Sequence, residues 1–142
     1  IYAAPASVDG TFVADAALAP DLEAPAGTQV NLLLVQSYVV QVEVPGLPEL
    51  ERELRCRLSS GPNAERIGLI AIGVNYGIGE ATGEALVDQN LPGLHLAVGD
   101  PAADVMGSGW RAPTSLPFCQ ARSTVLLDGE AIVRRGTLVE PS

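Results

Sequence analysis

The sequence predicts an α+β fold: a single domain over residues 1–142 that is predominantly β-sheet, with one main amphipathic helix at about residues 48–59 and a C-terminal β-hairpin. Three observations lead to this prediction. Short apolar runs, some alternating with polar residues, recur between turn signals, which is typical of strands. One segment instead repeats leucine at helical spacing. A length of 142 residues fits one domain with an adequate hydrophobic core.

The first part of the chain predicts a short strand followed by a strand pair. Residues 11–15 form the short strand, and the stretch after it contains Pro20 and Pro25, which favour a loop. Residues 29–35 are almost continuously apolar, whereas apolar residues occupy alternate positions in 38–44. Because successive side chains of a strand point to opposite faces, residues 38–44 should form a half-buried strand that pairs with 29–35.

The main helix follows the turn residues at positions 45 and 46. Pro48 suits the first helical turn, where a missing N–H costs nothing. Four leucines repeat at helical spacing: Leu47, Leu50, Leu54 and Leu58. The opposite face is charged and contains pairs four residues apart, such as Glu51 with Arg55. This pattern predicts a solvated helix face rather than a partner-binding surface.

The second part of the chain predicts further strands and turns. The glycine-spaced loop at 73–79 lacks the GxGxxG spacing of a nucleotide site, and the chain has no lysine for a P-loop. Asp128-Gly129 is a strong hairpin signal. In order, we expect a buried strand at 66–74, a short helix at 82–89, a buried strand at 94–98, a polar glycine-rich stretch at 100–113, hairpin strands at 124–127 and 130–133, and a final strand at 137–139.

Composition excludes several classes of function. The net charge of −9 disfavours binding to nucleic acid or to an anionic membrane surface. All eight basic residues are arginines, so a lysine nucleophile or Schiff base is excluded. Cys56 and Cys119 show no zinc-binding or disulfide-rich spacing. With no signal-peptide pattern in residues 1–5, these two cysteines predict reduced thiols and a cytoplasmic protein.

Five short motifs carry a family resemblance: IYAAP at 1–5, RIGL at 66–69, GVN at 73–75, HLAVGD at 95–100 and VLLDGE at 125–130. In this order the motifs resemble the C-terminal region of thermophilic metalloaminopeptidases of the aminopeptidase T type. The same fold is used by 2,5-dihydroxypyridine dioxygenase. The resemblance spans most of the chain but does not extend to the larger N-terminal part of those enzymes.

Carried over position by position, the resemblance argues against catalysis. His95, the single histidine, matches the metal ligand of the family's His-x-Ala-x-Gly motif. The family's His-x-Asp-Phe motif falls on residues 115–118, where Ser115 and Pro117 replace both ligands. The glutamate of a Gly-Glu pair corresponds to Leu69, and a further family glutamate would lie upstream of Ile1. Because a metal site needs three or more ligands, we expect no bound metal, no cofactor and no enzymatic activity.

The expected function is therefore binding. We expect a non-catalytic peptide-binding accessory protein that presents a ribosomally made precursor peptide to modifying enzymes in natural-product biosynthesis. The sequence is similar to accessory proteins of such pathways, of the kind found in crocagin biosynthesis. A sheet can accept an extended peptide as an added strand at an exposed edge. Members of the family are often dimers, which implies a homodimer here.

Four residues are candidates for peptide binding. Trp110 and Arg111 follow a glycine-flanked turn, and their residue types most often anchor interfaces. Tyr76 lies in its own glycine-rich loop, and His95 lies in a predicted strand. The structural alternatives are a tryptophan that closes over the core and a histidine that only packs or hydrogen-bonds.

Two alternative functions stay open at the level of sequence. A metal-dependent hydrolase or oxygenase could use relocated ligands, for which His95, Asp100 and Asp104 are the candidates. The chain could also be a structural subunit of a larger enzyme. Stoichiometric metal in the purified protein would favour the first, and stable co-purification with a larger enzyme would favour the second.

Overall fold

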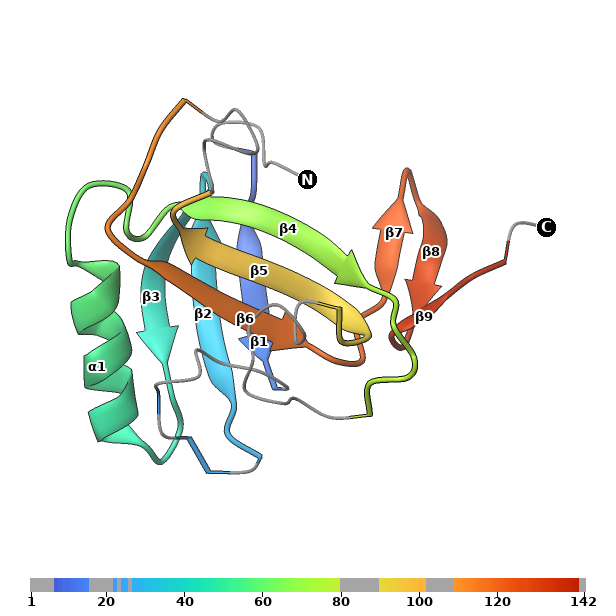
Figure 1. The fold of residues 1–142 in the computed structure, drawn as a ribbon, viewed down its shortest axis with the longest axis horizontal. Coiled ribbons are helices and arrows are strands. Elements are labelled where there is room, and N and C mark those ends of the chain that lie inside the picture. Colours follow the sequence, from blue (N-terminus) through green and yellow to red (C-terminus); the bar gives the residue numbers. More distant parts are fainter. Residues whose placement is uncertain are drawn as a thin grey trace.

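The computed structural model describes residues 7–15, 22, 24, 25, 27–79, 90–101 and 109–140. Within these residues, the strands form three antiparallel three-stranded sheets (Figure 1): sheet A in the order β1-β2-β3, sheet B in the order β4-β5-β6 and sheet C in the order β7-β8-β9. The elements are β1 (Gly10–Ala14), β2 (Val30–Val35), β3 (Tyr38–Glu43), α1 (Pro48–Leu58), β4 (Ile67–Gly73), β5 (Gly93–Gly99), β6 (Ser115–Gln120), β7 (Val125–Leu127), β8 (Glu130–Arg134) and β9 (Thr137–Leu138).

The predicted α+β class is wrong, because the described chain is built from sheets with one short helix. Helix α1 has 11 residues, only one fewer than predicted, and its buried leucines are Leu50, Leu54 and Leu58. Three turns of helix cover the side of β3 but form no helical layer, which an α+β fold requires (Figure 1). The predicted helix at 82–89 lies outside the described residues. No helix in the described part of the chain is both long and apolar enough to cross a membrane.

Sheets A and B enclose the core and are joined at two corners. At one corner the Ile67 N–H donates to the Ser37 carbonyl at 2.9 Å, and Tyr38 forms an isolated bridge with Arg66. At the other corner the Asp15 N–H donates to the Cys119 carbonyl at 3.0 Å. Figure 1 shows sheet B lying across sheet A, with the two sets of strands crossing. The buried residues between them include Phe12, Val30, Leu32, Leu34, Leu96, Val98, Leu116 and Phe118.

The predicted strand pair and hairpin are both confirmed. β2 pairs with β3 across a two-residue turn in which Gln36 and Ser37 have φ of 50° and 68°. β7 pairs with β8 across Asp128-Gly129, as the sequence predicts. Both turns place two consecutive residues at positive φ, a conformation whose twist matches that of the flanking strands. In both cases local turn chemistry set the pairing.

Strand β6 was not predicted, although it completes sheet B. It pairs with β5 along its full length, and Pro117 lies opposite Ala97. Proline has no N–H to give to a sheet, so a segment containing it does not resemble a strand from sequence. Pro117 is accommodated because β6 is an edge strand of sheet B.

Candidate functional site

The four positions that the resemblance assigns to metal ligands lie on one face of sheet B. Leu69 pairs with Ala97, which pairs with Pro117. His95 is two residues before Ala97, and Ser115 is two residues before Pro117. Paired residues and residues two apart on a strand point to the same side. Leu69, His95, Ser115 and Pro117 therefore share the side of sheet B that faces away from the core, and we call them the ligand-position face.

The ligand-position face offers little chemistry for a metal. Leu69 and Pro117 have no side-chain lone pair, and the Ser115 hydroxyl is neutral. His95 is the one strong metal ligand of the four. Among the residues that the structure describes, no group of three or more His, Cys, Asp or Glu side chains could hold a metal ion. The ligand-position face thus brings the four expected positions together, but only His95 among them is a strong metal ligand.

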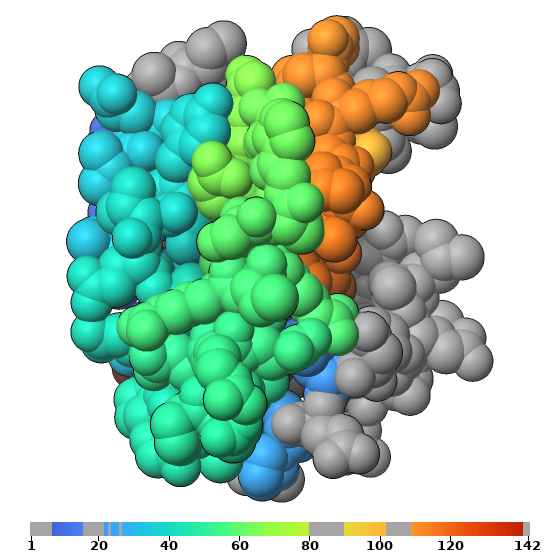
Figure 2. All heavy atoms as spheres, turned by 90° about the vertical axis from the view of Figure 1, so that its left-hand side faces the viewer, coloured from blue at the N-terminus to red at the C-terminus, as the bar shows by residue number. Residues whose placement is uncertain are grey.

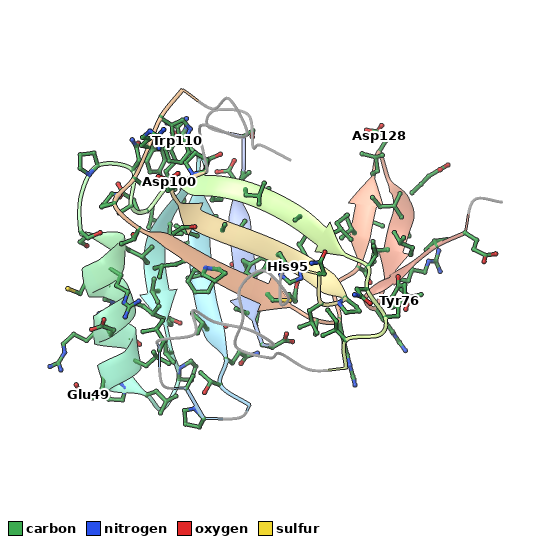
Figure 3. All side chains as sticks on the ribbon, in the orientation of Figure 1. Glu49, Tyr76, His95, Asp100, Trp110 and Asp128 are labelled. Atoms are coloured by element: carbon green, nitrogen blue, oxygen red, sulfur yellow. The ribbon has the colours of Figure 1, made fainter. Side chains whose placement is uncertain are left out.

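His95 is held by a main-chain hydrogen bond. Its Nε2 lies 2.7 Å from the Leu91 carbonyl oxygen and 3.5 Å from the Cys119 Sγ (Figure 3). A carbonyl only accepts, so Nε2 carries the proton and donates to Leu91. A Cβ added at Gly73 would lie 1.8 Å from the Leu91 oxygen and 2.9 Å from His95 Nε2, which leaves no room for a larger residue there. The histidine therefore fixes the chain that leads into β5.

Replacing His95 by alanine should lower the free energy of unfolding by about 1–2 kcal/mol, because the Leu91 carbonyl loses its donor in a partly buried setting. Urea denaturation followed by circular dichroism measures the change. Ser115→Ala, on the same face but exposed, is the matched control and should change stability by less than about 0.5 kcal/mol. Equal stability of the two variants would show that the His95 hydrogen bond is not structural.

Asp100, one of the two alternative ligands, does not lie beside His95. Asp100 follows β5, and its N–H donates to the Thr114 carbonyl at 2.7 Å. Five residues of extended strand separate it from His95, roughly 16 Å. One metal ion, with ligand bonds of about 2 Å, cannot bind both side chains. Asp104 lies outside the described residues.

The four candidate peptide-binding residues do not form one cluster. The Arg66 guanidinium lies 4.2 Å from the centre of the Trp110 ring, and the Arg111 carbonyl accepts from Asn63 Nδ2 at 3.2 Å. These contacts are at the start of β4. Tyr76 follows the end of β4, where its hydroxyl accepts from the Leu138 N–H at 2.8 Å. Figure 3 shows Trp110 and Tyr76 at opposite ends of sheet B. The seven residues of β4 separate them by roughly 23 Å.

The structure also shows a groove that sequence reasoning missed. It lies between β3 and the C-terminal half of α1 and has a volume of about 570 Å³. Figure 2 views the side of the molecule on which α1 and β3 lie. The sequence feature nearest to this groove is the Glu51–Arg55 pair, which the charge pattern assigns to a solvated helix face, although Arg55 lines the groove. The lining residues are Val39, Val40, Gln41, Val42, Arg55, Leu58, Ser59, Gly61 and Glu65.

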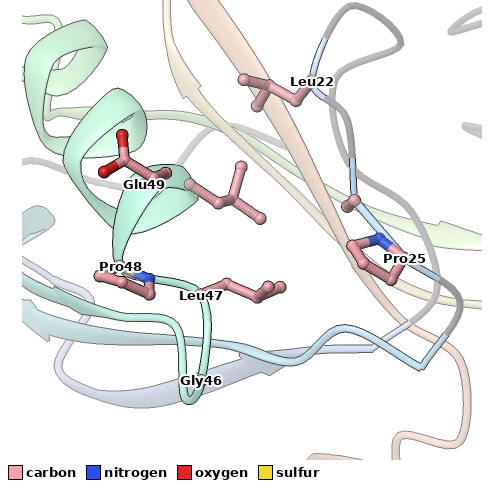
Figure 4. A pocket seen from close by; sticks show the side chains of 8 residues that line it. Leu22, Pro25, Gly46, Leu47, Pro48 and Glu49 are labelled. Carbon is pink, nitrogen blue, oxygen red and sulfur yellow. The ribbon is translucent and has the colours of Figure 1, made fainter.

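A second open pocket, of about 740 Å³, lies at the N-terminal end of α1 (Figure 4). Leu22 and Pro25 face Leu47 across it, and Glu49 is the one charged side chain among the described residues that line it. The Glu49 carboxylate accepts from the Arg52 guanidinium. With a single carboxylate that is already paired, this pocket suggests no chemistry of its own.

Comparisons with known proteins support the fold. No family model matches the chain, and no curated protein matches it. Among solved structures, it is similar to 2,5-dihydroxypyridine dioxygenase from Pseudomonas putida KT2440, with a TM-score of 0.75 and 18% identity, over 99% of this chain and 42% of that one. It is also similar to wild-type AmpT from Thermus thermophilus, with a TM-score of 0.61 and 18% identity, over 90% of this chain and 36% of the AmpT chain.

The chain thus spans less than half the length of either structure. At 18% identity the likeness concerns the fold. The fold that the sequence motifs implied is confirmed by both structures, whereas activity does not follow from it.

Proposed function

We propose that this chain is a non-catalytic peptide-binding accessory protein that presents a ribosomally made precursor peptide to modifying enzymes in natural-product biosynthesis. One observation carries the proposal: the ligand-position face unites the four expected positions on one side of sheet B, and three of them hold Leu69, Ser115 and Pro117. The chain shares its fold with a dioxygenase and with AmpT, and its described residues contain no group of three or more side chains that could hold a metal ion, which supports the proposal.

Peptide binding is the role that such a scaffold can retain. Extended peptides bind by adding a strand to a sheet edge, where main-chain hydrogen bonds give affinity and side-chain contacts give selectivity. This chain consists mainly of short antiparallel strands, and several large apolar side chains are exposed on them. The same proposal includes a cytoplasmic location, a homodimer, and modifying enzymes as partners that act on the bound peptide.

Metal analysis combined with calorimetry tests the proposal. The protein, purified without chelator, should contain far less than one metal ion per chain. It should bind the precursor peptide encoded beside its gene with a Kd in the micromolar range or tighter, which is about −8 kcal/mol. Near-stoichiometric iron, zinc or manganese that is lost in His95→Ala would instead support the metal-dependent hydrolase or oxygenase.

A further inference from the structure

We propose that the peptide docks as an added strand on the outer edge of β3 at residues 40–44, and that Arg55 and Glu51 of helix α1 occupy the place of its main chain until it binds. This inference rests on the proposed function and names the surface and the kind of peptide. Its evidence lies in the hydrogen bonds of the edge, the groove beside it, and the apolar face next to it.

At residues 42–44 the β3 edge is satisfied by helix side chains, whereas its start is paired with residues 65 and 66. The Val42 carbonyl accepts from Arg55 Nη2 at 3.2 Å, and the Val44 N–H donates to Glu51 Oε2 at 3.0 Å. Arg55 and Glu51 also pair with each other at 2.6 Å. The helix thus supplies a donor, Arg55, to the edge carbonyl and an acceptor, Glu51, to the edge N–H. An extended peptide offers the same groups from its own backbone.

Arg55 is the more displaceable of the two helix side chains. Its side chain is 59% exposed and that of Glu51 is 24% exposed, and an ion pair with such an exposed partner contributes little to stability. When a peptide replaces them, hydrogen bonds are exchanged one for one and the two charges move into water. The groove of about 570 Å³ beside residues 39–42 provides space for the incoming chain. The edge is therefore protected against indiscriminate pairing but remains open to a suitable partner.

The other described edges are less suitable for a strand of several residues. β7 and β9 have three and two residues, and the Leu138 N–H of β9 already donates to Tyr76. β1 and β6 are tied together where the Asp15 N–H donates to the Cys119 carbonyl. β4, the other edge strand of sheet B, has seven residues, but the groove lies along β3 and not along β4. β3 has six residues, and its first part is anchored by the Val39 N–H, which donates to the Glu65 carbonyl at 2.8 Å.

The surroundings of the edge define the peptide. Four exposed apolar residues lie on the β2–β3 hairpin: Leu33, Val35, Tyr38 and Val40, with Val40 57% exposed. Side chains on one face of an added strand would continue this apolar surface, and those on the other face would meet Arg55 and Glu65. The fitting partner is an extended peptide in which apolar and polar residues alternate.

The test uses a synthetic probe and amide NMR. The probe is an acetylated, amidated peptide of seven alternating valines and threonines with a lysine at each end. Its addition should shift the amide signals of residues 40–44 first. Arg55→Met removes the helix donor to Val42 and should tighten probe binding about fivefold, the equivalent of one net hydrogen bond. Arg52→Met, with the same loss of charge on the exposed face of α1, is the matched control and should leave binding unchanged.

Two further variants of the experiment complete it. Val40→Lys places a charge at the exposed edge and should weaken binding of the probe. N-methylation of alternate probe amides removes main-chain donors and should also weaken its binding. Shifts confined to another edge, or equal affinities for Arg55→Met and Arg52→Met, would overturn the inference.

The same titration with the precursor peptide separates this inference from the proposed function. Precursor binding that leaves the amides of residues 40–44 unmoved would reject the β3 edge while the peptide-binding function stands. Absence of any precursor binding would reject the function itself. Precursor binding with shifts at residues 40–44 would support both.

Discussion

Replacing Phe118 by alanine is expected to lower the free energy of unfolding by about 3–5 kcal/mol, the range for removal of a fully buried phenylalanine. Phe118 is 1% exposed and pairs with Leu96 of β5, so both side chains point into the space between sheets A and B. Without the ring, a cavity would form in the centre of the core, where neighbours can relax only partially. Urea denaturation followed by circular dichroism measures the loss.

The matched control for Phe118→Ala is Leu127→Ala. Leu127 is also a large apolar residue, but it is 61% exposed at the tip of the β7–β8 hairpin. Its truncation should change stability by less than about 0.5 kcal/mol. A Phe118→Ala protein as stable as Leu127→Ala would contradict the position of β6 in the core. Phe118, which the resemblance matches to the aromatic residue of the His-x-Asp-Phe motif, thus has a packing role in the core.

Replacing Gly99 by alanine is expected to cost about 2–5 kcal/mol of stability for two reasons that act together. Gly99 has a φ of +106°, which side-chain-bearing residues rarely adopt. A Cβ there would also lie 2.0 Å from the Thr114 carbonyl oxygen, which already accepts the N–H of Asp100. The backbone at the end of β5 would have to move away from β6.

Thermal unfolding by calorimetry, compared with Gly79→Ala, tests the role of Gly99. A Cβ at Gly79 would meet nothing within 4 Å, so this control should shift stability by less than about 0.5 kcal/mol. A Gly99→Ala variant that unfolds together with the control would show that the close approach of β5 to β6 is not required. We expect the larger loss to come with shifts of the Thr114 and Asp100 amide signals.

Gly99 and Phe118 show that residues of the motifs that carry the resemblance have structural roles. Gly99 is required by the backbone and Phe118 by the core. Leu69, Ser115 and Pro117 lie on the opposite side of the sheet, where no core packing depends on a metal-binding side chain. Residues with a structural role thus match the motifs, whereas Leu69, Ser115 and Pro117 differ from the ligands that the resemblance implies at these positions.

Much of the fold could be predicted from local patterns. The alternation in residues 38–44 and the turn at Asp128-Gly129 led to strand pairings that the structure contains. Leucine spacing placed the helix to within one residue at its end. The α+β class was nevertheless wrong, because a periodic pattern gives the existence of a helix but not whether it forms a layer. β6 was not predicted because it contains Pro117, and a proline, which has no N–H to donate, argues against a strand.

The candidate site depended more strongly on tertiary contacts. From the sequence, His95 was recognised as a solitary candidate ligand, and the missing ligands were assigned to Leu69, Ser115 and Pro117. Only the register of three strands showed that these four positions share one face. The sequence grouped Trp110 with Tyr76, but the length of β4 separates them.

The sequence by itself determined most of the strands and turns of the described residues, the main helix, the acidic charge and the lack of a second histidine, because each of these depends on neighbouring residues or on composition. The tertiary structure decided which strands meet, that the His95 Nε2 donates to Leu91, and that Arg55 and Glu51 cover the β3 edge. Such contacts join groups that are not adjacent in the chain. Local periodicity cannot specify them, because they arise only when the sheets and the helix pack around a common core.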